Sequence, residues 1–211
     1  MAEASTGTPR ERYRTQVRAE IKEHAWAQIA TAGASALSLN AIAKLMGLSG
    51  PALYRYFANR DELITDLVTD AYRSLADTLR AADADAASLA LALREWALAD
   101  PHRYLLIYGT PVPGYHAPAE ITAIAKEIMA TLLDVYVAAP ADRTAVAFDA
   151  HLEGHRDWAQ GHPATPATLH RALVSWTRLH GVLSLELAGH FTGMGFDPAQ
   201  LYAAEVEALA G

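Results

Sequence analysis

Residues 38–63 hold two short helical patterns separated by a single glycine, and no other feature constrains the fold of this chain as strongly. Ile42, Leu45 and Met46 recur at helical spacing before Gly47. A glycine can leave a helix in the left-handed conformation because it has no Cβ. Two helices joined by so short a turn indicate a helix-turn-helix, whose second helix projects from the domain and can enter the major groove of DNA.

The second helix of this pattern has its own start signals. Ser49 can cap it, and Pro51 stands in its first turn, where a missing N–H group is harmless. Leu53, Tyr54 and Phe57 then recur at helical spacing. We expect Leu53 and Phe57 to face inward, whereas the three residues between them cannot all do so.

Charge is distributed unevenly along the chain. Residues 1–60 carry eight basic and four acidic residues, a net charge of +4, while the rest carries nine basic and twenty acidic residues, −11, and the two sum to −7. Affinity for phosphates depends on the local patch and not on the total charge, so the asymmetry favours an N-terminal nucleic-acid interface. The alternative is a solvated surface of mixed charge.

The run from Leu53 to Leu63 resembles the recognition-helix signature of tetracycline-repressor (TetR) type transcriptional regulators. The similarity covers residues 14–63 in order, including a break at Gly33. Further along, Trp176, His180 and Gly181 resemble the Trp-His-Gly element that names one C-terminal subtype of that family. The resemblance implies an all-α fold, operator DNA as partner, a homodimer and a small-molecule effector.

The expected organisation follows from this resemblance and from helix boundary signals. We expect a flexible tail over residues 1–12, a helix-turn-helix domain over 13–60, and a helical effector-binding and dimerisation domain over 61–211. About nine or ten helices and no sheet are predicted, because no stretch sustains an alternation of period two. Capping residues and prolines predict helix starts at Asn59, Asp100-Pro101, Thr165-Pro166 and Asp197-Pro198, and a loop over 110–115 before a helix near Pro118.

The resemblance assigns DNA contacts residue by residue. Asn40 could pair with an adenine edge, while Gly50 and Ala52 offer only close approach or contact with a thymine methyl group. The full set of expected DNA-binding residues is Ser38, Asn40, Ser49, Gly50, Ala52, Tyr54, Arg55, Tyr56 and Arg60.

Three of these residues are expected to contact phosphates. Tyr54 and Tyr56 present hydroxyl groups on flat side chains, and Arg60 stands where family members often have lysine. Arg55 could read guanine or reach a phosphate, and the sequence does not choose between these roles. Core packing is the alternative for Tyr54, since aromatic residues at helical spacing are usually buried.

The pattern from Pro166 to about Gly189 is apolar over much of a helix circumference, so this helix must be buried on more than one side. We expect it to form, with the terminal helix from Pro198, a four-helix bundle between two subunits. The alternative is that both faces pack inside one subunit. The expected interface residues are Leu169, Leu173, Leu183, Leu187, Leu201, Val206 and Leu209.

Aromatic and histidine residues of the second domain are candidates to line a cavity for a small, largely apolar effector with one or two hydrogen-bonding groups. Trp176 and His180 stand one helical turn apart, although such residues more often fill a core. The candidates are Trp96, Tyr104, Tyr108, Tyr115, His116, Trp158, Trp176 and His180.

Other classes of function find less support. His151 and His155 stand one turn apart, a spacing that can place two imidazoles on one face for zinc or nickel. Glu153, Asp157 and His162 stand nearby, but His170 or His180 would have to fold back to complete a site. The chain has no cysteine, no Gly-x-Ser-x-Gly elbow and no phosphate-binding glycine loop, so we expect neither an enzyme nor a cofactor. No run approaches the roughly 20 apolar residues of a membrane span, so a cytoplasmic protein is expected. The alternative function is a helical small-molecule-binding protein without DNA-binding activity.

Overall fold

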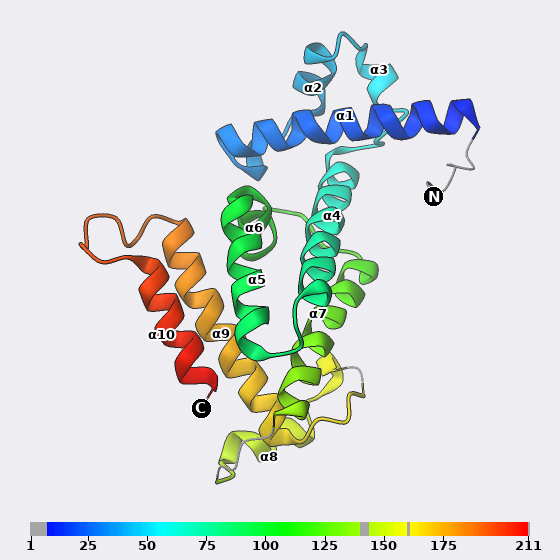
Figure 1. Ribbon diagram of the computed structural model, residues 1–211. Helices are drawn as coiled ribbons and strands as arrows, with labels where there is room; N and C mark the ends of the chain where they lie inside the picture. Colours follow the sequence, from blue (N-terminus) through cyan, green and yellow to red (C-terminus); the bar gives the residue numbers. More distant parts are fainter. Residues whose placement is uncertain (1–7, 140–143, 160, 211) are drawn as a thin grey trace, which may run out of the picture. The chain divides into compact units, whose positions relative to one another are not determined.

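The computed structural model describes residues 8–139, 144–159 and 161–210, and within these ranges the chain is helical without a strand. Figure 1 shows the course of the helices along the chain. The α-helices are α1 (Pro9–Ala32), α2 (Leu39–Leu45), α3 (Gly50–Leu53), α4 (Arg60–Ala81), α5 (Ala86–Ala99), α6 (Pro101–Tyr108), α7 (Ala119–Ala138), α8 (Ala147–Glu153), α9 (Pro166–Leu187) and α10 (Pro198–Ala210). Two 3₁₀ turns accompany them, η1 (Ala34–Ala36) and η2 (Asp157–Ala159). The all-α prediction is therefore confirmed.

The chain divides into two compact units. The N-terminal unit contains the residues up to Thr69 together with Thr110–His116, and the C-terminal unit contains Asp70–Gly109 and the residues from Ala117 onward. The long helix α4 contributes to both units. The expected boundary at residue 60 therefore differs from the observed division in two respects: the N-terminal unit continues nine residues further, and it includes the loop after α6.

The N-terminal unit is built on α1, whose apolar positions fall at every fourth residue. Val17, Ile21, Ala25 and Ile29 are buried along this stripe, which is the pattern of a helix that packs one face against a core. The α2 residues Leu39, Ile42 and Ala43, and the later residues Leu53, Phe57 and Leu63, are buried as well.

The first helix begins earlier than the predicted end of a tail at residue 12. Thr8 and Glu11 form a capping box, and Pro9 occupies the first turn. Residues 9–12 are therefore helical, while residues 1–7 of the expected tail lie outside the described part of the chain. The helix ends at Gly33, whose φ of 79° requires glycine.

The turn between α2 and α3 has the predicted glycine geometry, with a φ of 66° at Gly47. The second helix is shorter than its sequence pattern indicates, because α3 ends at Leu53 and turns follow as far as Tyr56. In this turn the Tyr56 N–H group donates to the Leu53 carbonyl at 2.8 Å. This bond spans three residues, as in a 3₁₀-helix, instead of the four of an α-helix. Leu53 and Phe57 are nevertheless fully buried, as predicted.

The C-terminal unit is a helical bundle around α9. Its core takes buried residues from α4, α5, α6, α7, α9 and α10, and α9 packs against α5, α6, α7, α8 and α10. Figure 1 shows α9 and α10, coloured orange to red, running side by side in opposite directions. No helix of the described residues is long and apolar enough to cross a bilayer.

Most helix boundaries in this unit agree with the sequence signals. Asp100 and Thr165 cap α6 and α9, each followed by a proline in the first turn. Asp197 accepts a hydrogen bond from Ala199 N–H at 2.9 Å at the start of α10. Before α4, Asn59 Oδ1 accepts from Glu62 N–H at 2.8 Å, which matches the predicted capping pair.

Candidate functional site

Two serines from the expected DNA-binding set shape the helix-turn-helix. Ser38 Oγ accepts from Ala41 N–H at 3.3 Å, and Ser49 Oγ accepts from Ala52 N–H at 3.3 Å. Each hydroxyl thus satisfies a backbone donor at the start of α2 or α3. In this structure both side chains serve as helix caps.

Asn40 of α2 and Gly50 of α3 lie next to each other, so the two helices approach closely at this point. A Cβ built on Gly50 would lie 3.8 Å from Asn40 Oδ1, so any side chain at position 50 would enter the space beside the asparagine. Asn40 is exposed, and Gly50 and Ala52 are half-buried. The missing side chain of Gly50 therefore leaves space beside the Asn40 amide.

The turn after α3 carries the remaining polar side chains of the set. Tyr54 is 45% exposed, which excludes core packing as its role within the chain. Arg55 is exposed, and Tyr56 is half-buried. The segment thus presents two hydroxyl groups and one guanidinium group.

Arg60 is engaged with the chain itself. Its Nη2 donates to the carbonyl groups of Ala34 and Ser35 at 2.8 and 3.2 Å, and Nε is buried without a hydrogen-bond partner among the described residues. Part of this guanidinium group therefore ties the start of α4 to η1.

Arg18 of α1 contacts the same region, a role that the sequence pattern does not indicate. Its guanidinium donates to the carbonyl of Tyr56, pairs with Asp66 at 2.6 Å and lies over the ring of Phe57 at 4.0 Å. It thereby holds the turn after α3 against α1 and α4. Only the fold could reveal this contact, because Asp66 lies 48 residues away in sequence.

In the C-terminal unit, four of the expected effector residues form one aromatic cluster. The His180 ring lies 4.1 Å from Trp176, 4.4 Å from Tyr108 and 5.5 Å from Tyr104, between ring centroids. Tyr104 Oη lies 2.9 Å from His180 Nδ1 and 2.9 Å from Ser184 Oγ. The cluster joins α6 to α9.

Burial changes the acidity of the cluster. It lowers the pKa of His180 from 6.5 to about 4, so the imidazole is neutral at neutral pH. Burial also raises the pKa values of Tyr104 and Tyr108, which keeps both phenols protonated. These four side chains therefore carry no charge.

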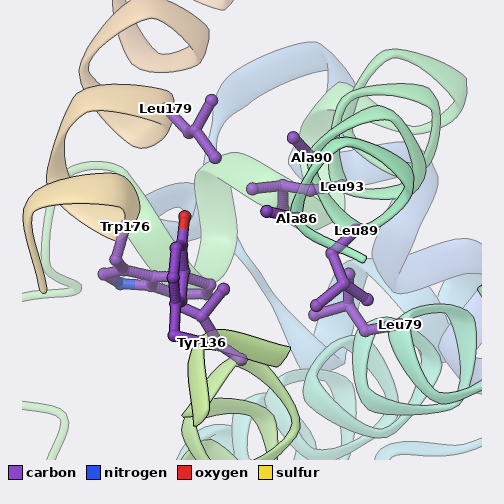
Figure 2. A pocket seen from close by; sticks show the side chains of 9 residues that line it. Leu79, Ala86, Leu89, Ala90, Leu93, Tyr136, Trp176 and Leu179 are labelled. Carbon is purple, nitrogen blue, oxygen red and sulfur yellow. The ribbon is translucent and has the colours of Figure 1, made fainter. Parts of the chain in front are cut away.

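Trp176 also lines a small apolar cavity of about 20 Å³. Figure 2 shows Trp176 and Tyr136 among leucine and alanine side chains of α4 and α5. The volume is enough for about one water molecule, whereas small-molecule sites measure roughly 300 Å³ or more. Its lining residues are Leu79, Ala86, Leu89, Ala90, Leu93, Leu132, Tyr136, Trp176 and Leu179.

The other expected effector residues lie elsewhere. Trp96 is buried and donates to Ser74 Oγ at 3.1 Å, while Trp158 donates to the carbonyl of His155 at 3.1 Å. Tyr115 and His116 belong to the N-terminal unit, where Tyr115 Oη lies 3.2 Å from Thr65 Oγ1. The sequence alone cannot tell these residues from those of the cluster, because all of them are aromatic or histidine residues in predominantly helical sequence.

His151 and His155 stack face to face instead of converging on a shared point. Their ring centroids are 4.0 Å apart, and His155 Nδ1 lies 2.9 Å from the carbonyl of His151. Within the described residues no group of three or more side chains could hold a metal ion.

The residues exposed on α9 are not the leucines that were expected at a subunit interface. Leu169 and Leu183 are fully buried in the single chain, because that face of α9 packs inside the C-terminal unit. Leu173, Leu187, Leu201, Val206 and Leu209 are half-buried. The exposed residues of α9 are Thr177, Arg178, Gly181 and Leu185, and α10 exposes Gln200, Ala203, Ala204, Glu207 and Ala208.

Two family models match the chain. Residues 21–67 match the family "Bacterial regulatory proteins, tetR family", and residues 86–209 match "Tetracyclin repressor-like, C-terminal domain". The first match covers the helix-turn-helix, and the second covers most of the C-terminal unit.

Similar proteins agree with these matches. The chain is 35% identical to the HTH-type transcriptional regulators Rv1816 of Mycobacterium tuberculosis (strain H37Rv) and Mb1846 of Mycobacterium bovis, over 93% of this chain and 92% of each relative. The crystal structure of a regulatory protein designated SCO4313 is 69% identical, with a TM-score of 0.89 and coverage of 96% of this chain and 98% of that one. A protein of unknown function from Rhodococcus sp. RHA1 shares the fold at 21% identity, with a TM-score of 0.66 over 92% of this chain and 93% of that one. The chain therefore belongs to the tetracycline-repressor (TetR) family of transcriptional regulators, which bind DNA and are not enzymes.

Proposed function

We propose that the protein is a homodimeric repressor that binds a near-palindromic operator and is released by a small, largely apolar effector. The observation that carries this proposal is the pairing of a TetR-type helix-turn-helix with an uncharged aromatic cluster in the C-terminal unit. A DNA-binding regulator acts where the chromosome is, so we also propose a cytoplasmic location.

At the operator, Asn40 reads an adenine edge, and the missing side chain of Gly50 leaves room for the base to approach. The exposed Tyr54, the half-buried Tyr56 and Arg55 bind the flanking phosphates. Arg60 has a smaller part than the sequence pattern indicates, since one of its nitrogens already binds η1. Ser38 and Ser49 act through the helix starts that they cap.

The dimer forms through the outer faces of α9 and α10. Small residues there, with Gly181 at the middle of the α9 face, permit close approach of two helices, and the 45% exposed Leu185 supplies apolar area. A two-fold protein reads a two-fold site, with half-sites about 34 Å apart. The half-buried residues Leu187, Leu201 and Leu209 lie at the margin of this surface.

The effector binds at the aromatic cluster and displaces Trp176, whose ring contacts His180 and which also lines the small cavity. The cavity of about 20 Å³ is too small for an effector, so binding requires a movement of Trp176 that enlarges it. The effector lowers DNA affinity only if it binds the open state more tightly than the closed state.

The chain offers two routes from this cluster to the DNA-binding unit. One is α4, which is continuous from Arg60 to Ala81. The other is α6, which carries Tyr104 and Tyr108 and leads directly into Thr110–His116. Pro111 and Pro113 stiffen this loop, and the Tyr115 hydroxyl contacts Thr65 of α4.

Selection from a pool of randomised DNA duplexes tests the regulatory assignment. The purified protein should enrich a two-fold symmetric sequence with half-sites one helical turn apart. Enrichment of a single asymmetric half-site would contradict the dimeric operator complex. Failure to enrich any sequence would favour the alternative, a ligand-binding protein that has lost its operator.

A further inference from the structure

The imidazole of His180 has a hydrogen-bond partner at one ring nitrogen and none among the described residues at the other. Nδ1 lies 2.9 Å from Tyr104 Oη, whereas Nε2 is buried and has no hydrogen-bond partner among the described residues. A buried polar group without a partner destabilises the folded chain, so nearly all such groups in native proteins are paired. An unpaired ring nitrogen inside an aromatic cluster is therefore a feature that a ligand would relieve.

The surroundings of His180 restrict what that ligand can be. Its ring neighbours are Tyr104, Tyr108 and Trp176, all uncharged. The pKa of His180, lowered to about 4 by burial, keeps the imidazole neutral as well. A charged ligand would lose its hydration without gaining a counterion, whereas a flat apolar ligand would stack on the rings.

The hydrogen-bond chain at Tyr104 is compatible with a proton on Nε2 of His180. Ser184 Oγ lies 2.9 Å from Tyr104 Oη, and the Tyr104 hydroxyl is nearer to His180 Nδ1 (2.9 Å) than to the His180 carbonyl (3.3 Å). When Ser184 donates to Tyr104 and Tyr104 donates to Nδ1, both hydroxyl groups are satisfied. The proton of the neutral ring then resides on Nε2, which becomes a donor.

We propose that the Nε2–H group of His180 selects the effector, and that the effector class is a neutral, planar aromatic molecule carrying a hydrogen-bond acceptor. This inference rests on the proposed effector role of the aromatic cluster. A carbonyl, an ether or a ring nitrogen fits the donor, whereas a molecule whose only polar group is an N–H donor leaves two donors opposed. Sites that hydrogen-bond one substrate group discriminate strongly against analogues that lack it, because the buried partner stays unpaired.

Four bicyclic probes separate these possibilities. Quinoline offers an acceptor, naphthalene offers neither donor nor acceptor, indole offers only an N–H donor, and 2-naphthoate adds a negative charge. Binding is measured at neutral pH by ligand-observed NMR titration. We expect quinoline to bind about tenfold more tightly than naphthalene, which corresponds to one buried hydrogen bond, and indole and 2-naphthoate to bind no better than naphthalene.

Two variants test whether the preference for quinoline depends on Nε2 of His180. His180→Phe keeps a ring but removes Nε2, so quinoline and naphthalene should bind equally. Tyr104→Phe removes the group that fixes the tautomer, and the preference for quinoline over indole should shrink. The wild-type ratios need no variant, so they test the proposal even if a substitution impairs folding, which a thermal melt would reveal.

The outcomes separate the effector chemistry from the regulatory function. Equal binding of quinoline and naphthalene by the wild type, or tighter binding of indole, would overturn the proposed role of Nε2–H, whatever the result with operator DNA. A preference for quinoline that persists in His180→Phe would overturn it too. A preference that disappears in His180→Phe supports the proposal. If quinoline then leaves operator binding unchanged, the proposed release from the operator fails while the selective site remains.

Discussion

The hydroxyl of Tyr104 lies 2.9 Å from Nδ1 of His180 and so joins α6 to α9 inside the C-terminal unit. Tyr104 is fully buried. Because α6 continues directly into the loop Thr110–His116 of the N-terminal unit, this contact stands at the start of a chain connection between the proposed effector site and the DNA-binding unit.

Acid should destabilise the protein in a way that depends on His180. Its pKa falls from 6.5 to about 4 on folding, so between these pH values the unfolded chain binds a proton that the folded chain does not. The unfolding free energy should therefore decrease as the pH falls through this window, by up to about 3 kcal/mol for this group, and be unaffected by it above the window.

The measurement is urea unfolding of the wild type and of His180→Phe at neutral pH and near the lower end of the window. The variant should lose less stability on acidification than the wild type. Tyr104, Tyr108 and Trp176 face the ring and do not titrate there, so the difference isolates His180. An equal loss in the two proteins would contradict a neutral buried imidazole.

Gly181 should control dimerisation. A Cβ at this position meets no atom within 4 Å in the single chain, so a side chain costs nothing inside the protomer but would obstruct close helix packing across a dimer. Gly181→Glu should convert the dimer to a monomer in sedimentation velocity. Gly181→Ala should stay dimeric and stabilise the helix by about 1 kcal/mol.

Gly154 provides the matched control. It also has no atom within 4 Å of a built Cβ, and it lies at the end of α8, a helix outside the proposed interface. Gly154→Glu should remain dimeric. If Gly181→Glu were dimeric as well, the α9 face would not be the interface.

Tyr115 should transmit binding from operator to effector site. Linkage is reciprocal, so if the effector weakens DNA binding, operator binding must in turn alter the effector site. We expect operator DNA to change hydrogen exchange of the α6 amides in the wild type. Tyr115→Phe removes the hydroxyl that contacts Thr65 and should reduce this response, whereas Tyr13→Phe, at an exposed position of α1, should leave it intact. An undiminished α6 response in Tyr115→Phe would mean that α4 alone carries the coupling.

The helix-turn-helix could be predicted from sequence because its determinants are local. Gly47 at φ 66°, Ser49 as a cap and the buried pair Leu53 and Phe57 follow from spacing and from residue type. The length of α3 was not predictable in this way. The helix ends at Leu53, and the turn that follows is held by a hydrogen bond from Arg18 of α1 to the carbonyl of Tyr56. The sequence around α3 gives no sign of this distant partner.

The C-terminal unit shows the limits of periodicity. The stripe of α9 that includes Leu169 and Leu183 was expected at a subunit interface, yet both residues are fully buried within the chain. Periodicity reveals an apolar face but not the element that covers it. Likewise, Tyr115 resembled the cavity residues in type, but the fold places it in the other unit.

Titration of operator DNA, followed by fluorescence anisotropy at several salt concentrations, tests the central claim most directly. The wild type should bind the selected palindrome tightly, with an affinity that falls as salt increases because phosphate contacts release counterions. Tyr54→Ala should weaken binding about tenfold through loss of a phosphate contact, while Leu91→Ala, an exposed change on α5, should not. Binding that is weak and indifferent to sequence, or a Tyr54→Ala variant that binds like the wild type, would contradict the proposed operator complex.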